Sequence, residues 1–132
     1  RSGKAQARPK AKPQGAAQER VLEMLRELLA AADNLVHNNK KIRSDFETLL
    51  NKKFVEKVDQ YDFLDPFAAE FKYSDGKISF RGNTDSQILV KAIVACVTEI
   101  ANDVGLTGQL RKQLDAWRRK YADEIIEFDI RL

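Results

Sequence analysis

One stretch of this sequence constrains the fold more than any other, because its apolar residues recur at alternating steps of four and three through four heptads. The positions are Val21, Leu25, Leu28, Ala32, Leu35, Asn39, Ile42, Phe46 and Leu49. A sustained spacing of about 3.5 residues is typical of a coiled-coil or bundle helix. A second apolar stripe runs beside the first, at Leu22, Leu29, Val36 and Leu50. Because two stripes are wider than a coiled-coil seam, the pattern predicts a long N-terminal helix in a bundle or a globular core.

Asn39 is the one polar residue in this seam, and it leaves two interpretations open. A buried Asn can fix the register and the oligomeric state of a coiled coil at a cost in stability. Alternatively, the polar run of residues 38–41 is a loop that breaks the helix in two.

The width of the apolar face also predicts that one chain covers it only in part. Soluble monomers rarely expose a large apolar patch, and a symmetric dimer is the commonest way to bury one. We therefore expect a homodimer or a protein partner to contact this helix. The expected interface residues are Leu25, Leu28, Leu35, Asn39, Ile42 and Phe46.

The middle of the sequence predicts a β-hairpin. Phe71, Tyr73, Ile78 and Phe80 alternate with polar residues, and Asp75-Gly76 separates the two halves. An Asp-Gly step between alternating apolar residues is the strongest short-range signal for a hairpin. Just before it, Asp65-Pro66 predicts the N-cap and first residue of a short helix.

A buried helix is predicted after the hairpin. Thr84 and Gln87 have the spacing of a capping box, with Thr84 as the N-cap. The helix that follows, residues 88–104, is apolar on nearly every side and must be covered on several of them. Gly105 is suited to end it in a left-handed conformation.

The C-terminal part predicts one more helix and one more strand. Leu110, Leu114, Trp117 and Tyr121 share one face of an amphipathic helix. Residues 125–132 alternate in part and predict a third strand beside the hairpin, because a lone hairpin is marginally stable in water. The predicted fold class is therefore α+β.

The charge divides the chain into a linker and a domain. Residues 1–18 contain no large apolar residue and predict a disordered basic linker before a single domain of residues 19–132. Residues 1–20 carry six Lys and Arg against Glu19, a net charge of +5, whereas the rest carries 17 against 19 acidic residues, a net −2. We therefore expect at most weak binding of nucleic acid, through the linker.

The compartment follows from the cysteine count and from the apolar runs. One thiol, Cys96, excludes an internal disulfide and favours a buried, inert cysteine. The most apolar window, residues 88–101, contains two charges and is shorter than the roughly 20 residues of a membrane span. We expect a cytoplasmic protein, the C-terminal domain of a larger one, that does not contact a membrane.

A group of five aromatic residues could line a ligand pocket. Its members are Phe63, Phe67, Phe71, Tyr73 and Phe80. The alternative is that these rings form core between the hairpin and the helices, which is the usual place for large apolar side chains.

Two charged clusters have a functional and a plain interpretation. Arg118, Arg119 and Lys120 lie between two aromatic residues and could grip phosphates, or they form a solvated basic face. Asp59, Asp62 and Asp65 recur at every third residue, which is not the spacing of a calcium loop and favours a solvated acidic face. We predict no catalytic, metal or cofactor site.

These features favour a protein-interaction or dimerisation module that is not an enzyme, serving as the regulatory domain of a larger protein. One alternative is a small-molecule sensor that uses the aromatic pocket. A second alternative is a nucleic-acid-binding domain.

Overall fold

The structure is a computed structural model that describes residues 11–65, 67–82 and 84–132, with residues 11–17 described by their backbone alone. Its elements in chain order are α1 (Ala11–Asn38), α2 (Phe46–Lys57), the 3-10 helix η1 (Asp62–Leu64), β1 (Phe71–Ser74), β2 (Lys77–Phe80), α3 (Ser86–Asp103), α4 (Thr107–Gln113), α5 (Asp115–Lys120) and α6 (Ala122–Glu127). The fold is α+β, as the sequence predicts. Among the described residues, no helix has both the length and the apolar character to cross a membrane.

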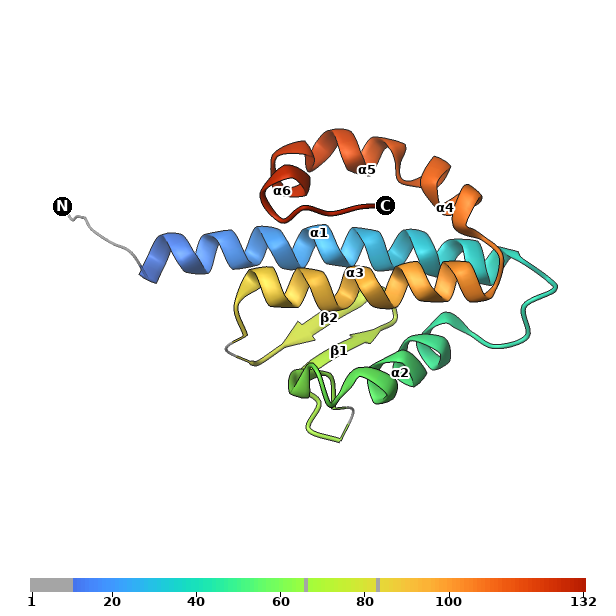
Figure 1. The fold of residues 1–132 in the computed structure, drawn as a ribbon, viewed down its shortest axis with the longest axis horizontal. Helices are drawn as coiled ribbons and strands as arrows, with labels where there is room; N and C mark the ends of the chain where they lie inside the picture. Colours follow the sequence, from blue (N-terminus) through green and yellow to red (C-terminus); the bar gives the residue numbers. More distant parts are fainter. Residues whose placement is uncertain (1–10, 66, 83) are drawn as a thin grey trace.

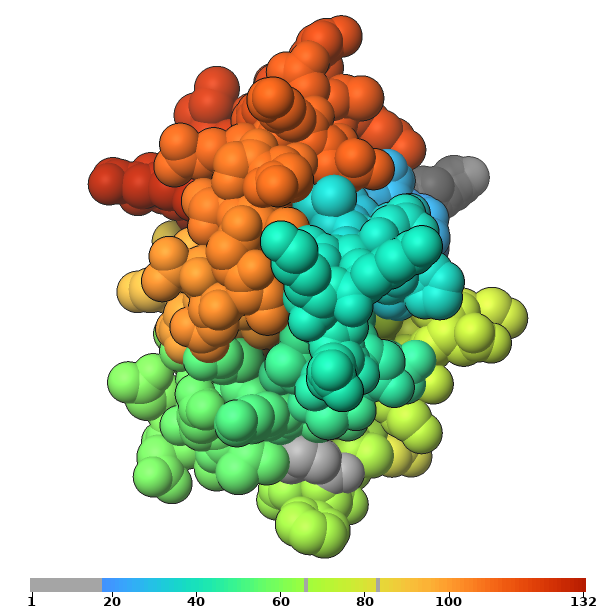
Figure 2. Space-filling model, turned by 90° about the vertical axis from the view of Figure 1, so that its right-hand side faces the viewer, coloured from blue at the N-terminus to red at the C-terminus, as the bar shows by residue number. Residues whose placement is uncertain are grey.

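The molecule has three layers with α1 and α3 in the middle. These two helices lie side by side, with α4–α6 on one side of α1 and the hairpin with α2 on the other (Figure 1). An end-on view shows the same stack, with the orange α4–α5 region above the cyan end of α1 and the green α2 below (Figure 2). Because α1 is covered from both sides, most residues of its two apolar stripes are buried, and Leu22 and Leu35 are half-buried.

The N-terminal helix breaks at the polar run. α1 ends at Asn38, and the Asn39 side chain accepts a hydrogen bond from the backbone N–H of Lys41 at 3.0 Å. Such a local Asx turn competes with helical hydrogen bonding. α2 then begins after Asp45, whose carboxylate caps it by accepting from Thr48 N at 2.8 Å. The loop interpretation of residues 38–41 is therefore confirmed. Residues 11–18, which we predicted to be disordered, form the first turns of α1, and residues 1–10 lie outside the described part.

The hairpin has the predicted register and turn. Phe71 pairs with Phe80 and Tyr73 with Ile78, while Asp75 and Gly76 have φ values of 55° and 78°. Positive φ at both central residues is the mark of a type I′ turn, which only Gly, Asn and Asp adopt readily. Phe71 and Tyr73 are buried against α2, whose Phe54 and Phe46 each contact one of them edge-to-face at 5.8 Å between ring centroids.

The predicted third strand is wrong. Residues 122–127 form α6, and residues 128–132 lie on the opposite side of α1 from the hairpin (Figure 1). Tyr121, Ile125 and Phe128 follow helical spacing, which buries Tyr121 and packs Ile125 and Phe128 against the core, and this outweighs an alternation confined to the last five residues. The predicted amphipathic helix is likewise divided into α4, α5 and α6, although its apolar face is buried.

Two cap predictions also need correction. Asp85, not Thr84, caps α3, because its carboxylate accepts from Gln87 N at 2.8 Å. A carboxylate is a stronger acceptor than a hydroxyl for a backbone N–H at a helix start. No helix follows Asp65, since residues 67–69 form a turn and the short helix η1 precedes it. Gly105 ends α3 as predicted, with a φ of 73°.

Candidate interaction site

The predicted seam is divided between α1, the loop after it and the start of α2, and its deepest residues are core. Leu25, Leu28 and Phe46 are buried within the chain, and Leu35, Asn39 and Ile42 are half-buried. Trp117 of α5 lies across the helix and donates its indole N–H to the Met24 carbonyl at 2.9 Å. The chain therefore covers half of the predicted interface residues completely and the other half in part, and a partner could reach the deepest residues only by opening the core.

The five aromatic residues do not form one group. Phe63, Phe71 and Tyr73 are buried, and Phe80 packs against Phe63 and Phe71 with ring centroids 6.2 and 6.1 Å apart. These four rings pack in the core or against it. Phe67 departs from them completely, because its side chain is 98% exposed.

Tyr73 joins the hairpin to α1 through a hydrogen bond. Its hydroxyl donates to the Asp33 carboxylate at 2.9 Å. Burial and this carboxylate raise the pKa of Tyr73 well above its usual range, so the phenol stays a donor.

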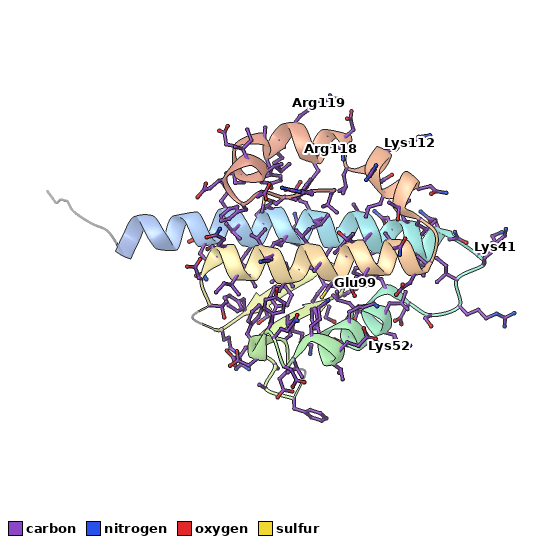
Figure 3. All side chains as sticks on the ribbon, in the orientation of Figure 1. Lys41, Lys52, Glu99, Lys112, Arg118 and Arg119 are labelled. Carbon is purple, nitrogen blue, oxygen red and sulfur yellow. The ribbon has the colours of Figure 1, made fainter. Side chains whose placement is uncertain are left out.

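The predicted basic patch is engaged within the chain. Arg119 pairs with Asp115, Lys120 lies 2.8 Å from Glu27, and Arg118 donates to the Arg111 carbonyl at 2.7 Å. Figure 3 places Arg118 and Arg119 on the α5 side of the molecule. Glu27 holds the pKa of Lys120 above its usual value. Because these cations already have partners, the cluster is less available for phosphates than its sequence indicates.

Ion pairs on the other side hold α2 to α3. Lys53 lies 2.9 Å from Asp103, and Lys57 lies 2.5 Å from Glu99. Their carboxylate partners raise the pKa of both lysines. Figure 3 shows Glu99 where these helices meet. These pairs are structural, since each charge meets its opposite across a helix–helix contact.

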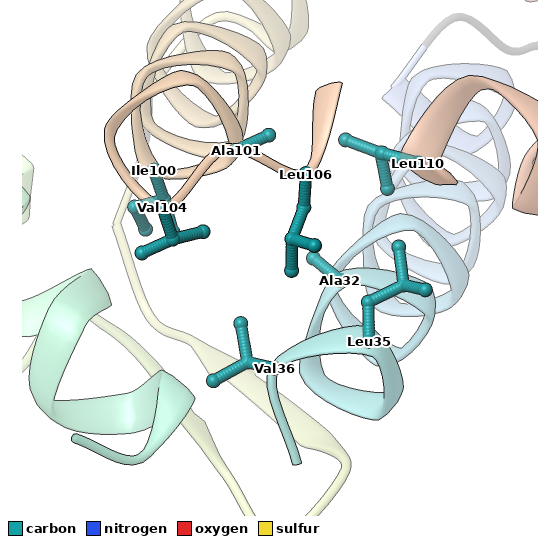
Figure 4. A pocket seen from close by; sticks show the side chains of 8 residues that line it. All are labelled: Ala32, Leu35, Val36, Ile100, Ala101, Val104, Leu106 and Leu110. Carbon is teal, nitrogen blue, oxygen red and sulfur yellow. The ribbon is translucent and has the colours of Figure 1, made fainter. Parts of the chain in front are cut away.

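A small apolar cavity lies where α1, α3 and α4 meet (Figure 4). Its walls are Ala32, Leu35, Val36, Ile100, Ala101, Val104, Leu106 and Leu110. The cavity volume is about 10 Å³, which is no larger than one water molecule requires. It is a packing defect and cannot hold a ligand.

Cys96 is buried as predicted, and burial raises the pKa of its thiol to about 12. A thiol in this state is a poor nucleophile. Within the part of the chain that the structure describes, no three His, Cys, Asp or Glu side chains are placed to hold a metal ion.

Phe67 is presented by a braced turn. We call residues 65 and 67–70, between η1 and β1, the Phe67 turn. The Asp65 carboxylate accepts from Phe67 N at 2.9 Å, and the Asp65 carbonyl accepts from Ala69 N at 3.1 Å. Leu64 before the turn and Phe71 after it are buried. The exposed ring is thus carried by a turn that is anchored in the core at both ends.

The backbone of this turn is strained at one residue. Ala69 has a φ of 55°, in the left-handed region that residues other than Gly seldom adopt. Arg81 stabilises this arrangement, because its backbone N–H donates to the Glu70 carbonyl at 2.8 Å and its side chain reaches the Ala69 carbonyl at 3.4 Å. Strain that surrounding contacts hold in place is often found at functional sites.

The surroundings of Phe67 are acidic. Residues 58–70 contain four carboxylates and no Lys, Arg or His. Asp59 and Asp62 are exposed, and Asp65 and Glu70 are half-buried. The Phe67 turn therefore combines an exposed aromatic ring with an acidic segment, and the Arg81 side chain at the Ala69 carbonyl is a cation beside it.

Sequence reasoning grouped Phe67 with the other rings and treated the aspartates as a separate feature. A signal for the site was present, because an Asx turn at Asp65 and two alanines after Phe67 leave little to bury that ring. No protein family, curated protein or solved structure matches this chain at a significant level.

Proposed function

We propose that this chain is a non-catalytic interaction module that binds a protein partner through the Phe67 turn. The observation that carries the proposal is the 98% exposure of Phe67 on a turn braced by Asp65 and Ala69. Aromatic residues are enriched among the few side chains that dominate protein–protein binding energy. The hydrogen bonds that brace the turn reduce the conformational entropy that its backbone loses when a partner binds.

The charges around the ring define the partner. Asp59, Asp62, Asp65 and Glu70 favour a surface on which Lys or Arg surround an apolar pocket that accepts the phenyl ring. The same carboxylates disfavour an anionic membrane surface, which would repel them. A cytoplasmic location, in which the free thiol of Cys96 remains reduced, belongs to this proposal.

The test compares three versions of the full 132-residue chain as bait in extracts of cells that encode it. Phe67→Ser removes the ring, and Ile126→Ser is the matched control, because Ile126 is an exposed apolar residue on α6. We expect a partner that binds the wild type and the control equally and binds Phe67→Ser at least tenfold more weakly. If every captured partner binds Phe67→Ser as tightly as it binds the wild type, the proposal is refuted.

Charge reversal tests the chemistry of the same partner. Asp62→Lys should weaken binding and reduce its dependence on salt, because exposed charges are screened within about 10 Å at 0.1 M salt. Binding that is insensitive both to salt and to Asp62→Lys would remove the basic rim from the proposal and leave only the apolar pocket.

A further inference from the structure

A second concave surface lies between α3 and the chain that follows α6. Its volume is about 340 Å³. Its lining residues are Gln87, Val90, Lys91, Val94, Ala95, Phe128, Asp129, Ile130 and Arg131. We call it the α3–tail groove. Small-molecule sites range from about 300 to 1,000 Å³, so the groove is at the small end of that range.

The walls of the groove come from both elements and combine apolar side chains with the polar side chains of Gln87, Lys91, Asp129 and Arg131. Val90 of α3 and Ile130 of the tail are buried at its base, while Val94, Ala95 and Phe128 remain half-buried. α3 thus keeps an apolar stripe that the tail covers only in part. A ligand with an apolar body would complete that cover.

The tail wall is already formed. Asp129 has a φ of 53°, its N–H donates to the Ile126 carbonyl at 3.3 Å, and Ile130 N donates to the Ile125 carbonyl at 3.0 Å. These two bonds and the left-handed residue make a Schellman motif, which fixes the direction of the chain after α6. Binding would not have to order the tail first.

The rim carries a net positive charge. Lys91 is exposed and has no ion-pair partner among the described residues. Arg131 lies 3.2 Å from Asp129, but the two side chains are 82% and 76% exposed, so this pair contributes little and can rearrange. Two cations against one carboxylate favour a ligand with one negative charge.

The shape selects a slender ligand. Residues 87–95, which line the groove on α3, span about 12 Å of helix at 1.5 Å per residue. A helix is about 10–12 Å across with its side chains and would enter a groove of this volume only in part. A second copy of the chain fits poorly as well, because a concave, positively charged face is not complementary to itself.

We propose that the α3–tail groove binds an amphipathic carboxylate, with the apolar chain along Val90, Val94 and Ile130 and the carboxylate between Lys91 and Arg131. This site is separate from the Phe67 turn, and neither proposal depends on the other.

The test is a methyl NMR titration of the full chain with sodium decanoate below its micelle concentration. We expect saturable shifts of the Val90, Val94, Ala95 and Ile130 methyl groups. Decanol and decyltrimethylammonium have the same chain without the negative charge and should bind at least tenfold more weakly. Equal affinity for all three probes, or shifts that do not saturate, would overturn the proposal.

Charge-reversal variants show whether the rim recognises the carboxylate. Lys91→Glu should weaken decanoate at least tenfold and strengthen the ammonium probe. Lys112→Glu is the matched control, because Lys112 is an exposed lysine on α4 that does not line the groove, and it should leave both affinities unchanged. Equal losses in the two variants would reduce the effect to net charge. Concentration-dependent shifts of the same methyl groups without ligand would make a second copy the occupant.

Discussion

The α1 helix and the Phe67 turn both carry large apolar side chains, several in the helix and one in the turn, but the fold treats them in opposite ways. The heptad residues Leu25 and Leu28 are completely buried, whereas Phe67 is almost completely exposed. In α1, a regular 3.5-residue spacing directs every large side chain toward α3 on one side or α4–α5 on the other. In the turn, the backbone reverses between two buried anchors, and the ring between them points outward. Burial therefore follows backbone geometry more than hydrophobicity.

The largest effect is expected in the seam. Leu28→Asp places a carboxylate where the side chain is completely buried, and it should reduce the free energy of unfolding by more than about 4 kcal/mol. Urea unfolding followed by the fluorescence of Trp117, the one tryptophan in the chain, measures this loss.

The control for that variant is Ile126→Asp on the exposed face of α6. It should change the free energy of unfolding by less than about 0.5 kcal/mol, as exposed substitutions usually do. A folded, stable Leu28→Asp protein would show that the heptad face is not core and would restore the predicted interface.

A smaller effect comes from pH, through the buried thiol of α3. Burial raises the pKa of Cys96 to about 12, above the value of about 8.5 of an unfolded cysteine. Above that lower value the unfolded chain loses the proton first, so stability falls as the pH rises toward 12. One such group contributes a slope of at most about 1.4 kcal/mol per pH unit.

Cys96→Ala isolates this contribution. The difference in unfolding free energy between wild type and variant should be constant below about pH 8 and should shrink as the pH rises from there. A difference that does not change up to pH 11 would mean that the thiol reaches solvent in the folded state.

Particular residues show what the sequence reveals and what it hides. Asp75-Gly76 predicts its turn because few residues tolerate two positive φ values. The heptad pattern predicts a buried face, but it does not reveal what covers that face. Part of that cover comes from Leu110, Leu114 and Trp117, far along the chain, so the local pattern could not show how much of the predicted interface lies in the core.

The same reasoning accounts for the misplaced C-terminal strand and for Phe67. The alternation of residues 128–132 is local, whereas the packing of Ile125 and Phe128 against the core depends on tertiary structure. Phe67 resembles its neighbours in the sequence, and only the path of the turn separates it from them.

A substitution in the Phe67 turn should change the free energy of unfolding only slightly, and should increase it, whereas Leu28→Asp in the seam decreases it. Ala69→Gly removes the Cβ from a residue at a φ of 55°, where an L-residue costs about 1–2 kcal/mol. The greater conformational freedom of Gly in the unfolded chain reduces this stabilisation by about 0.5–1 kcal/mol. We expect a stabilisation of about 0.5 kcal/mol, measured by urea unfolding. A clear destabilisation would show that Ala69 is not strained.

The smallest effect on stability is expected at Phe67, and it separates the two regions most sharply. Phe67→Ser removes a ring that is 98% exposed, so the folded state loses almost no apolar burial. The Asp65 carboxylate can still accept a hydrogen bond from the backbone N–H of residue 67, because serine has the same backbone N–H. The free energy of unfolding should therefore stay within about 0.5 kcal/mol of the wild type. A loss above about 1 kcal/mol would mean that the ring packs on the protein in solution, and the Phe67 turn would then be core like the seam. An unchanged stability together with lost partner binding would show that this residue is retained for recognition and not for folding.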